Sequence, residues 1–127
     1  MKKSFDTQEL QLIVHCSSIL RACPVVPFQL ANKINGCKIA ADGALKTIQG
    51  QLDLIAERLT KKNEKQCNED KLAVLNNPVE IELTQLNEAD FVTLDISGDK
   101  EVTQADGTVK KLSYRDAYFN LLGLIIL

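Results

Sequence analysis

The stretch PFQLANKINGCKIAADGALKTIQGQLDLIAERLTK, from Pro27 to Lys61, decides the fold because it reads as one long helix with two different faces. Apolar residues recur every seven positions in two sets, one being Ile34, Ala41, Ile48 and Ile55 and the other Ala31, Leu45, Leu52 and Leu59. The resulting three- and four-residue spacing is typical of a helix that packs against another helix. Lys38 is the one polar residue in this seam, and we expect its ammonium group to snorkel past the edge, with a carboxylate or a bound anion as alternative partners.

The opposite side of this helix is a ridge of small residues. Its members are Gly36, Ala40, Gly43, Thr47 and Gly50, with the glycines seven positions apart. A glycine costs about 1 kcal/mol relative to alanine inside a helix, so three cost on the order of 3 kcal/mol. Close approach of another helix would offset that cost. The ridge therefore predicts a contact with the C-terminal segment or with a second copy of the chain, and a homo-oligomer is our hypothesis.

A shorter helix precedes the long one. Asp6-Thr7-Gln8-Glu9 is a capping box, and the apolar pattern after it continues to about Ala22, where Pro24 ends the helix. Pro27 suits the first turn of the next helix. Because the linker between them only has room to reverse the chain, residues 6–61 are predicted to form an antiparallel helical hairpin.

The second half, residues 62–127, changes in character. Residues 60–68 read as a charged loop and residues 69–75 as a short helix, whereas residues 79–84 and 91–96 alternate as strands do. Asp106-Gly107 predicts a β-hairpin, Ser113 with Asp116 predicts the start of a last helix, and the apolar residues 125–127 are expected to be buried. We therefore predict one domain, residues 1–127, of the α+β class and mainly α: the helical hairpin with its long second helix, followed by a short helix, a small antiparallel sheet and a C-terminal helix.

The composition is that of an ordinary globular protein. Hydrophobic residues make up 45% and charged residues 25% of the 127-residue chain, and the net charge is −2. This balance does not favour nucleic acid as a partner. The N-terminal residues lack the apolar run of a secretion signal, and no apolar stretch approaches the roughly 18 residues that span a bilayer. We expect a cytoplasmic protein with no membrane partner.

The cysteines and the single histidine do not indicate metal or cofactor chemistry. Cys16, Cys23, Cys37 and Cys67 contain no C-x-x-C pair, and His15 is the only imidazole. We expect reduced thiols that pack as small hydrophobic side chains, with a disulfide or a metal site as the alternatives. No metal and no cofactor is predicted.

Catalytic patterns are missing too. His15 and Cys16 are adjacent on a helix, so their side chains point about 100° apart and do not form a nucleophile and base pair. Glu80 and Glu82 share one side of a strand as an acid pair would, but the wet face of any amphipathic strand looks the same. We predict that the chain is not an enzyme.

Polar residues near the start of the long helix form the one candidate ligand site. Asn32, Lys33, Asn35 and Lys38 would converge with Arg21 if the hairpin closes tightly. A helix N-terminus favours anions, so this cluster would suit a phosphate-bearing small molecule in a pocket between subunits. The alternative is a helix end lined with solvated side chains, which is the usual arrangement.

The order of these features resembles a known family. A short helix, a proline-containing turn, FQLANKIN at residues 28–35 opening a long helix and VEIEL at residues 79–83 are similar to a family of small phage-encoded proteins of unknown function. The similarity covers roughly the first ninety residues, and the hairpin at Asp106-Gly107 is an addition to the family's plan. The resemblance implies a virus-encoded, non-enzymatic binding protein, and it carries over no functional residue.

Two functions fit that implication. In the first, a homo-oligomer binds a small host signalling molecule or a host protein and so blunts host defence. In the second, the chain is a head, connector or tail component of a virion. Sequestration predicts a polar pocket, whereas a virion component predicts broad, flat contacts and no pocket.

Overall fold

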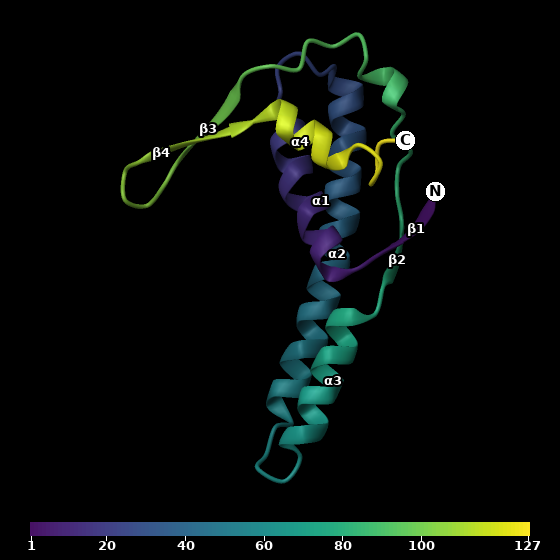
Figure 1. The fold of residues 1–127 in the computed structure, drawn as a ribbon, viewed down its shortest axis with the longest axis vertical. Coiled ribbons are helices and arrows are strands. Elements are labelled where there is room, and N and C mark those ends of the chain that lie inside the picture. The colour runs from purple at the N-terminus through teal and green to yellow at the C-terminus, as the bar shows by residue number, and fades with distance from the viewer.

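The computed structural model describes residues 1–127 and has two separate two-stranded antiparallel sheets and four α-helices (Figure 1). This is the predicted α+β, mainly α class, with the predicted helical hairpin, β-hairpin and C-terminal helix. The elements in chain order are β1 (Lys2–Phe5), α1 (Thr7–Leu20), α2 (Phe28–Glu57), α3 (Glu64–Asn76), β2 (Val79–Glu82), the 3-10 helix η1 (Glu88–Asp90), β3 (Asp99–Thr103), β4 (Val109–Ser113) and α4 (Tyr114–Leu121).

Helix α2 is the longest element, with 30 residues and a length of about 45 Å. It begins directly after Pro27 and ends at Glu57, four residues before the predicted end at Lys61. The residues that it buries are Leu30, Ile34, Cys37, Ala41, Ala44 and Ile48. They repeat at three- and four-residue intervals and define the inner side of α2.

Only one of the two predicted heptad sets forms the centre of this seam. Ile34, Ala41 and Ile48 are buried as predicted, but the other positions of the seam are Leu30, Cys37 and Ala44. The predicted second set is confirmed in part, since Ala31, Leu45 and Leu52 are half-buried and pack at the margin of the core, whereas Leu59 is exposed. Because Cys37 and Ala44 have short side chains, neighbouring backbone can approach α2 at these two positions. The side of the helix that carries them therefore faces the core. Lys38 consequently lies half-buried beside the seam.

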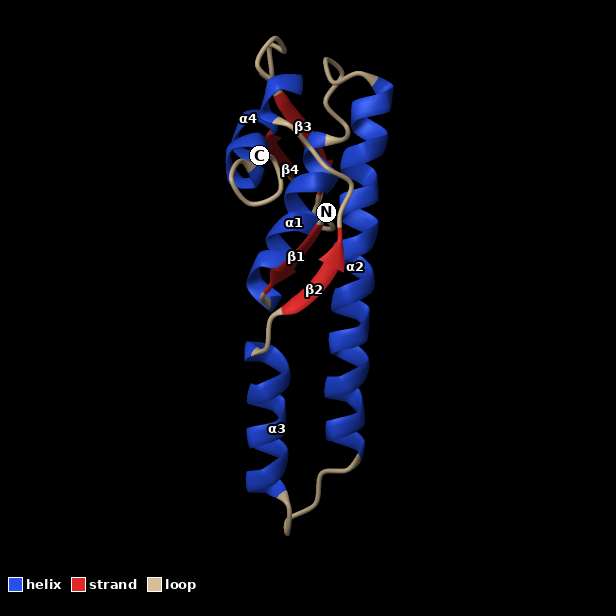
Figure 2. Cartoon of the chain, turned by 90° about the vertical axis from the view of Figure 1, so that its right-hand side faces the viewer, coloured by secondary structure: helices blue, strands red, loops and turns tan.

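Helices α4, α1 and α2 lie in that order as three layers, with α1 in the middle (Figure 2). The predicted capping box at the start of α1 is confirmed: the Glu9 amide donates to Asp6 Oδ1 at 2.8 Å, and the Asp6 amide donates to Glu9 Oε1 at 3.0 Å. Leu10, Ile13 and Leu20 of α1 are fully buried. The core of the molecule therefore surrounds α1 and the N-terminal half of α2.

Helix α3 runs alongside the C-terminal half of α2 (Figure 1). It begins at Glu64, so the predicted loop is confirmed at residues 60–63 but is wrong at residues 64–68, and the helix starts five residues before the predicted position 69. The turn is closed locally instead: Asn63 accepts a hydrogen bond from the Thr60 amide at 2.6 Å and donates one to the Arg58 carbonyl at 2.8 Å. Cys67 is then buried one turn into the helix, which extends the contact with α2.

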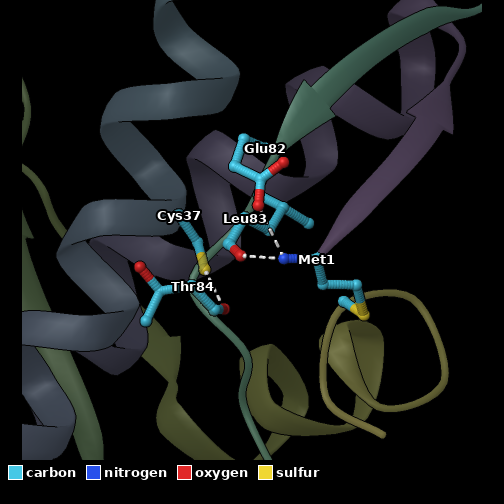
Figure 3. Close-up of polar contacts among 5 residues, drawn as sticks. All are labelled: Met1, Cys37, Glu82, Leu83 and Thr84. Atoms are coloured by element: carbon cyan, nitrogen blue, oxygen red, sulfur yellow. Dashed lines mark hydrogen bonds and ion pairs between the residues drawn. The ribbon is translucent and has the colours of Figure 1, made fainter.

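Strand β1 was not predicted. It pairs antiparallel with β2, from Lys2 opposite Glu82 to Phe5 opposite Val79. Just after β2 the chain reaches α2, where the Cys37 thiol donates to the Thr84 carbonyl at 3.3 Å (Figure 3). The Met1 amine lies on the other side of this segment, 2.9 Å from Glu82 Oε1 and 3.1 Å from the Leu83 carbonyl oxygen (Figure 3). Segment 79–84 is thus held from both sides.

The predicted strand at residues 91–96 is also wrong. Phe91 follows η1, and the Leu94 amide donates to the Phe91 carbonyl at 3.0 Å, which makes a turn with no partner strand. Phe91 and Ile96 are buried as anchors of this loop. The C-terminal tail curls back so that the Leu127 amide donates to the Leu86 carbonyl at 3.1 Å.

The β-hairpin and the last helix are confirmed. Strands β3 and β4 pair from Asp99 opposite Ser113 to Thr103 opposite Val109, and the hairpin projects away from the helices (Figure 1). Gly107 in its turn has φ +85°, a conformation that glycine adopts without strain. Ser113 caps α4 by accepting a hydrogen bond from the Asp116 amide at 3.2 Å. The tail is buried at Ile125 and Ile126 as predicted, but Leu127 is exposed.

The buried thiol of Cys37 predicts a pH dependence of stability. Burial raises the pKa of Cys37 from 9.0 to about 11, whereas the unfolded chain loses this proton near 9.0. Between these values the folded state binds more protons than the unfolded state, so the free energy of unfolding should fall as the pH rises and should be independent of this group below the window. The Cys37→Ala variant should show a shallower fall between pH 9 and pH 11 in urea titrations. Parallel curves for the two proteins would contradict the assignment.

Candidate functional site

One side of α2 is not covered by any other part of the chain. The residues on it are Phe28, Asn32, Ile39, Gly43, Gly50 and Leu54, which lie within about 80° of one another around the helix, opposite the inner side. We call them the outer face of α2. In Figure 2 the helix forms one edge of the molecule, and the other helices and the strands lie to one side of it.

The outer face includes three exposed large apolar side chains. Phe28 is 83% exposed, Ile39 62% and Leu54 54%. Lys46, Asp53 and Glu57 are exposed charged residues on this side, and Lys46 Nζ lies 3.5 Å from Asp42 Oδ2. Exposed large apolar side chains on the same side of the helix as two glycines with no neighbour make this face a candidate interface.

The three glycines of the predicted ridge have different surroundings. A side chain at Gly36 would meet Thr84 Oγ1 at 3.2 Å, so this glycine packs against the segment after β2 and not against a helix. Nothing lies within 4 Å of the corresponding position at Gly43 or Gly50. The other two members of the ridge also differ in burial, because Ala40 is half-buried at the core and Thr47 is exposed. Within one chain, the predicted helix contact along the ridge is absent.

The predicted polar cluster forms in part. An Arg21 guanidinium nitrogen donates a hydrogen bond to Asn35 Oδ1, which joins the end of α1 to the first turns of α2. Beside this contact is a hollow of about 330 Å³, whose lining residues are Arg21, Ala22, Phe28, Ala31, Asn32 and Asn35. Lys33 and Lys38 do not line it. The structure therefore brings together Arg21, Asn32 and Asn35 and leaves the two lysines elsewhere on the helix.

Sequence reasoning missed a second hollow, on α4. Its volume is about 240 Å³, and it is lined by Phe91, Val92, Leu94, Asp95, Ile96, Arg115, Tyr118 and Phe119. The Phe91 and Tyr118 ring centroids are 5.2 Å apart, and the Arg115 guanidinium lies 5.5 Å from the Phe119 centroid. Burial, with the Glu88 carboxylate nearby, raises the pKa of Tyr118. The aromatic pair at the end of α4 was the only available signal, since residues 91–96 read as a strand.

The groups considered for catalysis do not form a reactive pair. His15 is exposed, whereas the adjacent Cys16 is buried, and burial raises the pKa of the Cys16 thiol. Glu80 and Glu82 are both exposed, as the wet face of a strand is. The hydrogen bond that the Met1 amine donates lowers the pKa of the Glu82 carboxyl group. None of these residues is arranged to activate a nucleophile.

The potential metal ligands are dispersed over the structure, and the cysteines lie in its interior. No three His, Cys, Asp or Glu side chains gather where they could hold a metal ion. All four cysteines are free thiols and buried, which confirms the prediction that they pack as small hydrophobic residues. No helix has both the length and the apolar character needed to cross a bilayer.

Comparison with known proteins gives no guide to function. No protein-family model matches the chain, and no match is found among curated proteins or solved structures. The resemblance to phage proteins stays a prediction. The function has to be inferred from the outer face of α2 and from the hollow beside Arg21.

Alanine substitution should distinguish the glycines. Gly43→Ala and Gly50→Ala should each raise the free energy of unfolding by about 0.5–1 kcal/mol, because alanine favours the helix and the added methyl group meets nothing. Gly36→Ala should give a smaller gain or a loss, because its methyl group displaces Thr84. Urea denaturation at low protein concentration measures all three. Equal gains at the three positions would contradict the contact between Gly36 and Thr84.

Proposed function

We propose that this chain is a non-enzymatic binding protein that works as a homo-oligomer through the outer face of α2. The observation that carries the proposal is that Ile39 and Leu54 are exposed beside two glycines that have no neighbour. Large apolar side chains gain roughly 1.5–3 kcal/mol each when they are fully buried. A second copy that covered this face would bury such groups on both chains.

The two bare glycines support the same conclusion. Gly43 and Gly50 together cost on the order of 2 kcal/mol in helix stability, and nothing within the chain offsets this cost. A helix face without side chains allows two helices to come closer than the usual 8–10 Å, with more van der Waals contact along their length. Helix-to-helix association would supply the missing compensation.

The ligand that we propose is an anionic small molecule bound beside Arg21. The hollow there offers one cation and the side-chain amides of Asn32 and Asn35, close to the N-terminus of α2. Arg is suited to phosphate and carboxylate groups because its guanidinium donates several hydrogen bonds in a fixed plane. Together with the resemblance to phage proteins, this chemistry supports sequestration of a host signalling molecule in the host cytoplasm, as a counter-defence.

A virion component is the second candidate function. The observation that favours it is the β-hairpin, whose residues from Glu101 to Lys111 are all exposed (Figure 1). A two-stranded hairpin that does not pack against anything is marginally stable in water, so a projecting arm of this kind is suited to contacts with a neighbouring protein. This function requires broad contacts and does not use the hollow beside Arg21.

Self-association is tested by the Gly43→Leu variant. Nothing lies within 4 Å of a Cβ atom placed at this exposed position, so the fold should be kept, but close approach of a second α2 should be blocked. We expect the unaltered protein to show a mass above 14.1 kDa in sedimentation or light scattering. The variant should associate at least tenfold more weakly, while Lys71→Leu on the exposed side of α3 serves as the control. A mass of one chain for the unaltered protein at all concentrations would end the proposal.

Ligand binding is tested by incubating the purified protein with host nucleotide extracts and identifying retained molecules by mass spectrometry. Arg21→Gln should lower retention at least tenfold, because it removes the cation from the hollow. Lys33→Gln removes the same charge from a position outside the hollow and should retain the ligand. Equal losses in the two variants would contradict the site. A protein that retains nothing and co-purifies with virions would instead support the second function.

A further inference from the structure

The large aliphatic residues and the glycines of the outer face follow a symmetric order along the sequence. Ile39, Gly43, Gly50 and Leu54 are separated by four, seven and four residues. The order is therefore the same in both directions from the midpoint between Lys46 and Thr47: a glycine first, then a large aliphatic residue four positions further out. A contact between identical surfaces across a two-fold axis needs a surface of this kind, in which residue i meets residue j and residue j meets residue i.

We propose that two copies pack their α2 helices antiparallel, with a two-fold axis passing between Lys46 and Thr47. Ile39 of each copy then lies opposite Leu54 of the other, and Gly43 lies opposite Gly50. This arrangement rests on the self-association proposed above and adds its orientation and register. The glycines allow the two backbones to approach at the centre, and the aliphatic pairs close the contact at both ends.

The charges along α2 favour the antiparallel orientation. The part of the helix on the N-terminal side of the axis carries three cations and one acid, and the part on the C-terminal side carries two acids and no cation; these residues are Lys33, Lys38, Lys46 and Asp42, then Asp53 and Glu57. Antiparallel pairing sets the positive half of one helix beside the negative half of the other, and it also opposes the two helix dipoles. Parallel pairing would set like charges together.

Few charges lie at the centre of the contact. Lys46 lies near the axis, but it is already paired with Asp42 on its own helix. The cations that follow α2, such as Arg58 and Lys61, belong to the turn that leads to α3. The outer face near the axis is therefore free of unpaired charge, as the core of a protein interface usually is.

The available area is sufficient for a reversible dimer. A 30-residue helix about 45 Å long and about 10–12 Å wide offers roughly 500 Å² on one face, or about 1,000 Å² for the two copies. Specific interfaces begin at about this size. The elements that pack on α2 leave the stretch from Ile39 to Leu54 free on this face, because α1 and α3 contact its inner side and the segment after β2 reaches the helix at Gly36 and Cys37 (Figure 2).

Disulfide trapping tests the register. Gly43→Cys and Gly50→Cys are prepared separately in the full chain, whose four native thiols are buried, and each is oxidised alone and in an equal mixture. In the proposed dimer, equivalent residues at position 43 are offset by about 10 Å along the helices, beyond the roughly 7 Å reach of a disulfide. Positions 43 and 50 face each other. Cross-linked dimer is therefore expected in the mixture, and no more than background is expected from either variant alone.

Controls separate the register from self-association. Lys71→Cys lies on the exposed side of α3 and should give only background cross-linking with either variant. Cross-linking of Gly43→Cys with itself would show parallel pairing and would overturn the inference, while leaving the homo-oligomer intact. A dimer by mass that gives no cross-link in the mixture would overturn it too. A monomer by mass would overturn both proposals.

Discussion

The structure depends on the burial of one side of α2. The inner side of this helix is covered in series by two shorter helices, α1 over the N-terminal half and α3 over the C-terminal half. The core residues contributed by α1 and α4 surround the first half, whereas the second half is covered by α3, which buries only Cys67. Because stability follows buried apolar area, the α3 end should open more readily than the rest of the molecule. A single-sided support of this kind leaves the other side of α2 free from Ile39 to Leu54.

The parts of the fold that could be predicted are those encoded locally. Asp6 with Glu9, Ser113 with Asp116, and Asp106-Gly107 each specify a cap or a turn from residues three or fewer positions apart, and all three are present. Strand β1 could not be predicted, because the residues with which it pairs lie 74 to 80 positions further along the chain, at residues 79–82. Residues 91–96 alternate as a strand does, but no strand edge is within reach, so they form a loop.

Part of the candidate site could be predicted from the geometry of the two helices. Arg21 meets Asn35 because the seven-residue linker, residues 21–27, returns the chain beside the end of α1. Lys33 and Asn35 are two positions apart and so lie on different sides of the helix, which prevents them from lining one hollow. The unusual glycine spacing identified the ridge, but whether a neighbour covers it depends on where β2 ends. The aromatic hollow on α4 depends on the placement of a loop that the sequence pattern does not specify.

The core is completed by contacts between residues that lie far apart in the sequence, and this determines the order in which parts of the chain can fold. The helices α1 and α2 are adjacent in sequence and can pair as soon as both have been synthesised, since contacts between near neighbours form fastest. The other side of α1 is covered by α4, and Leu86 is buried beside Ile126, so both wait for residues 114–126. Phe5 waits similarly for strand β2. A nascent chain therefore exposes the apolar side of α1 until nearly all of its residues have left the ribosome, and this interval is when it is most open to aggregation or to a chaperone.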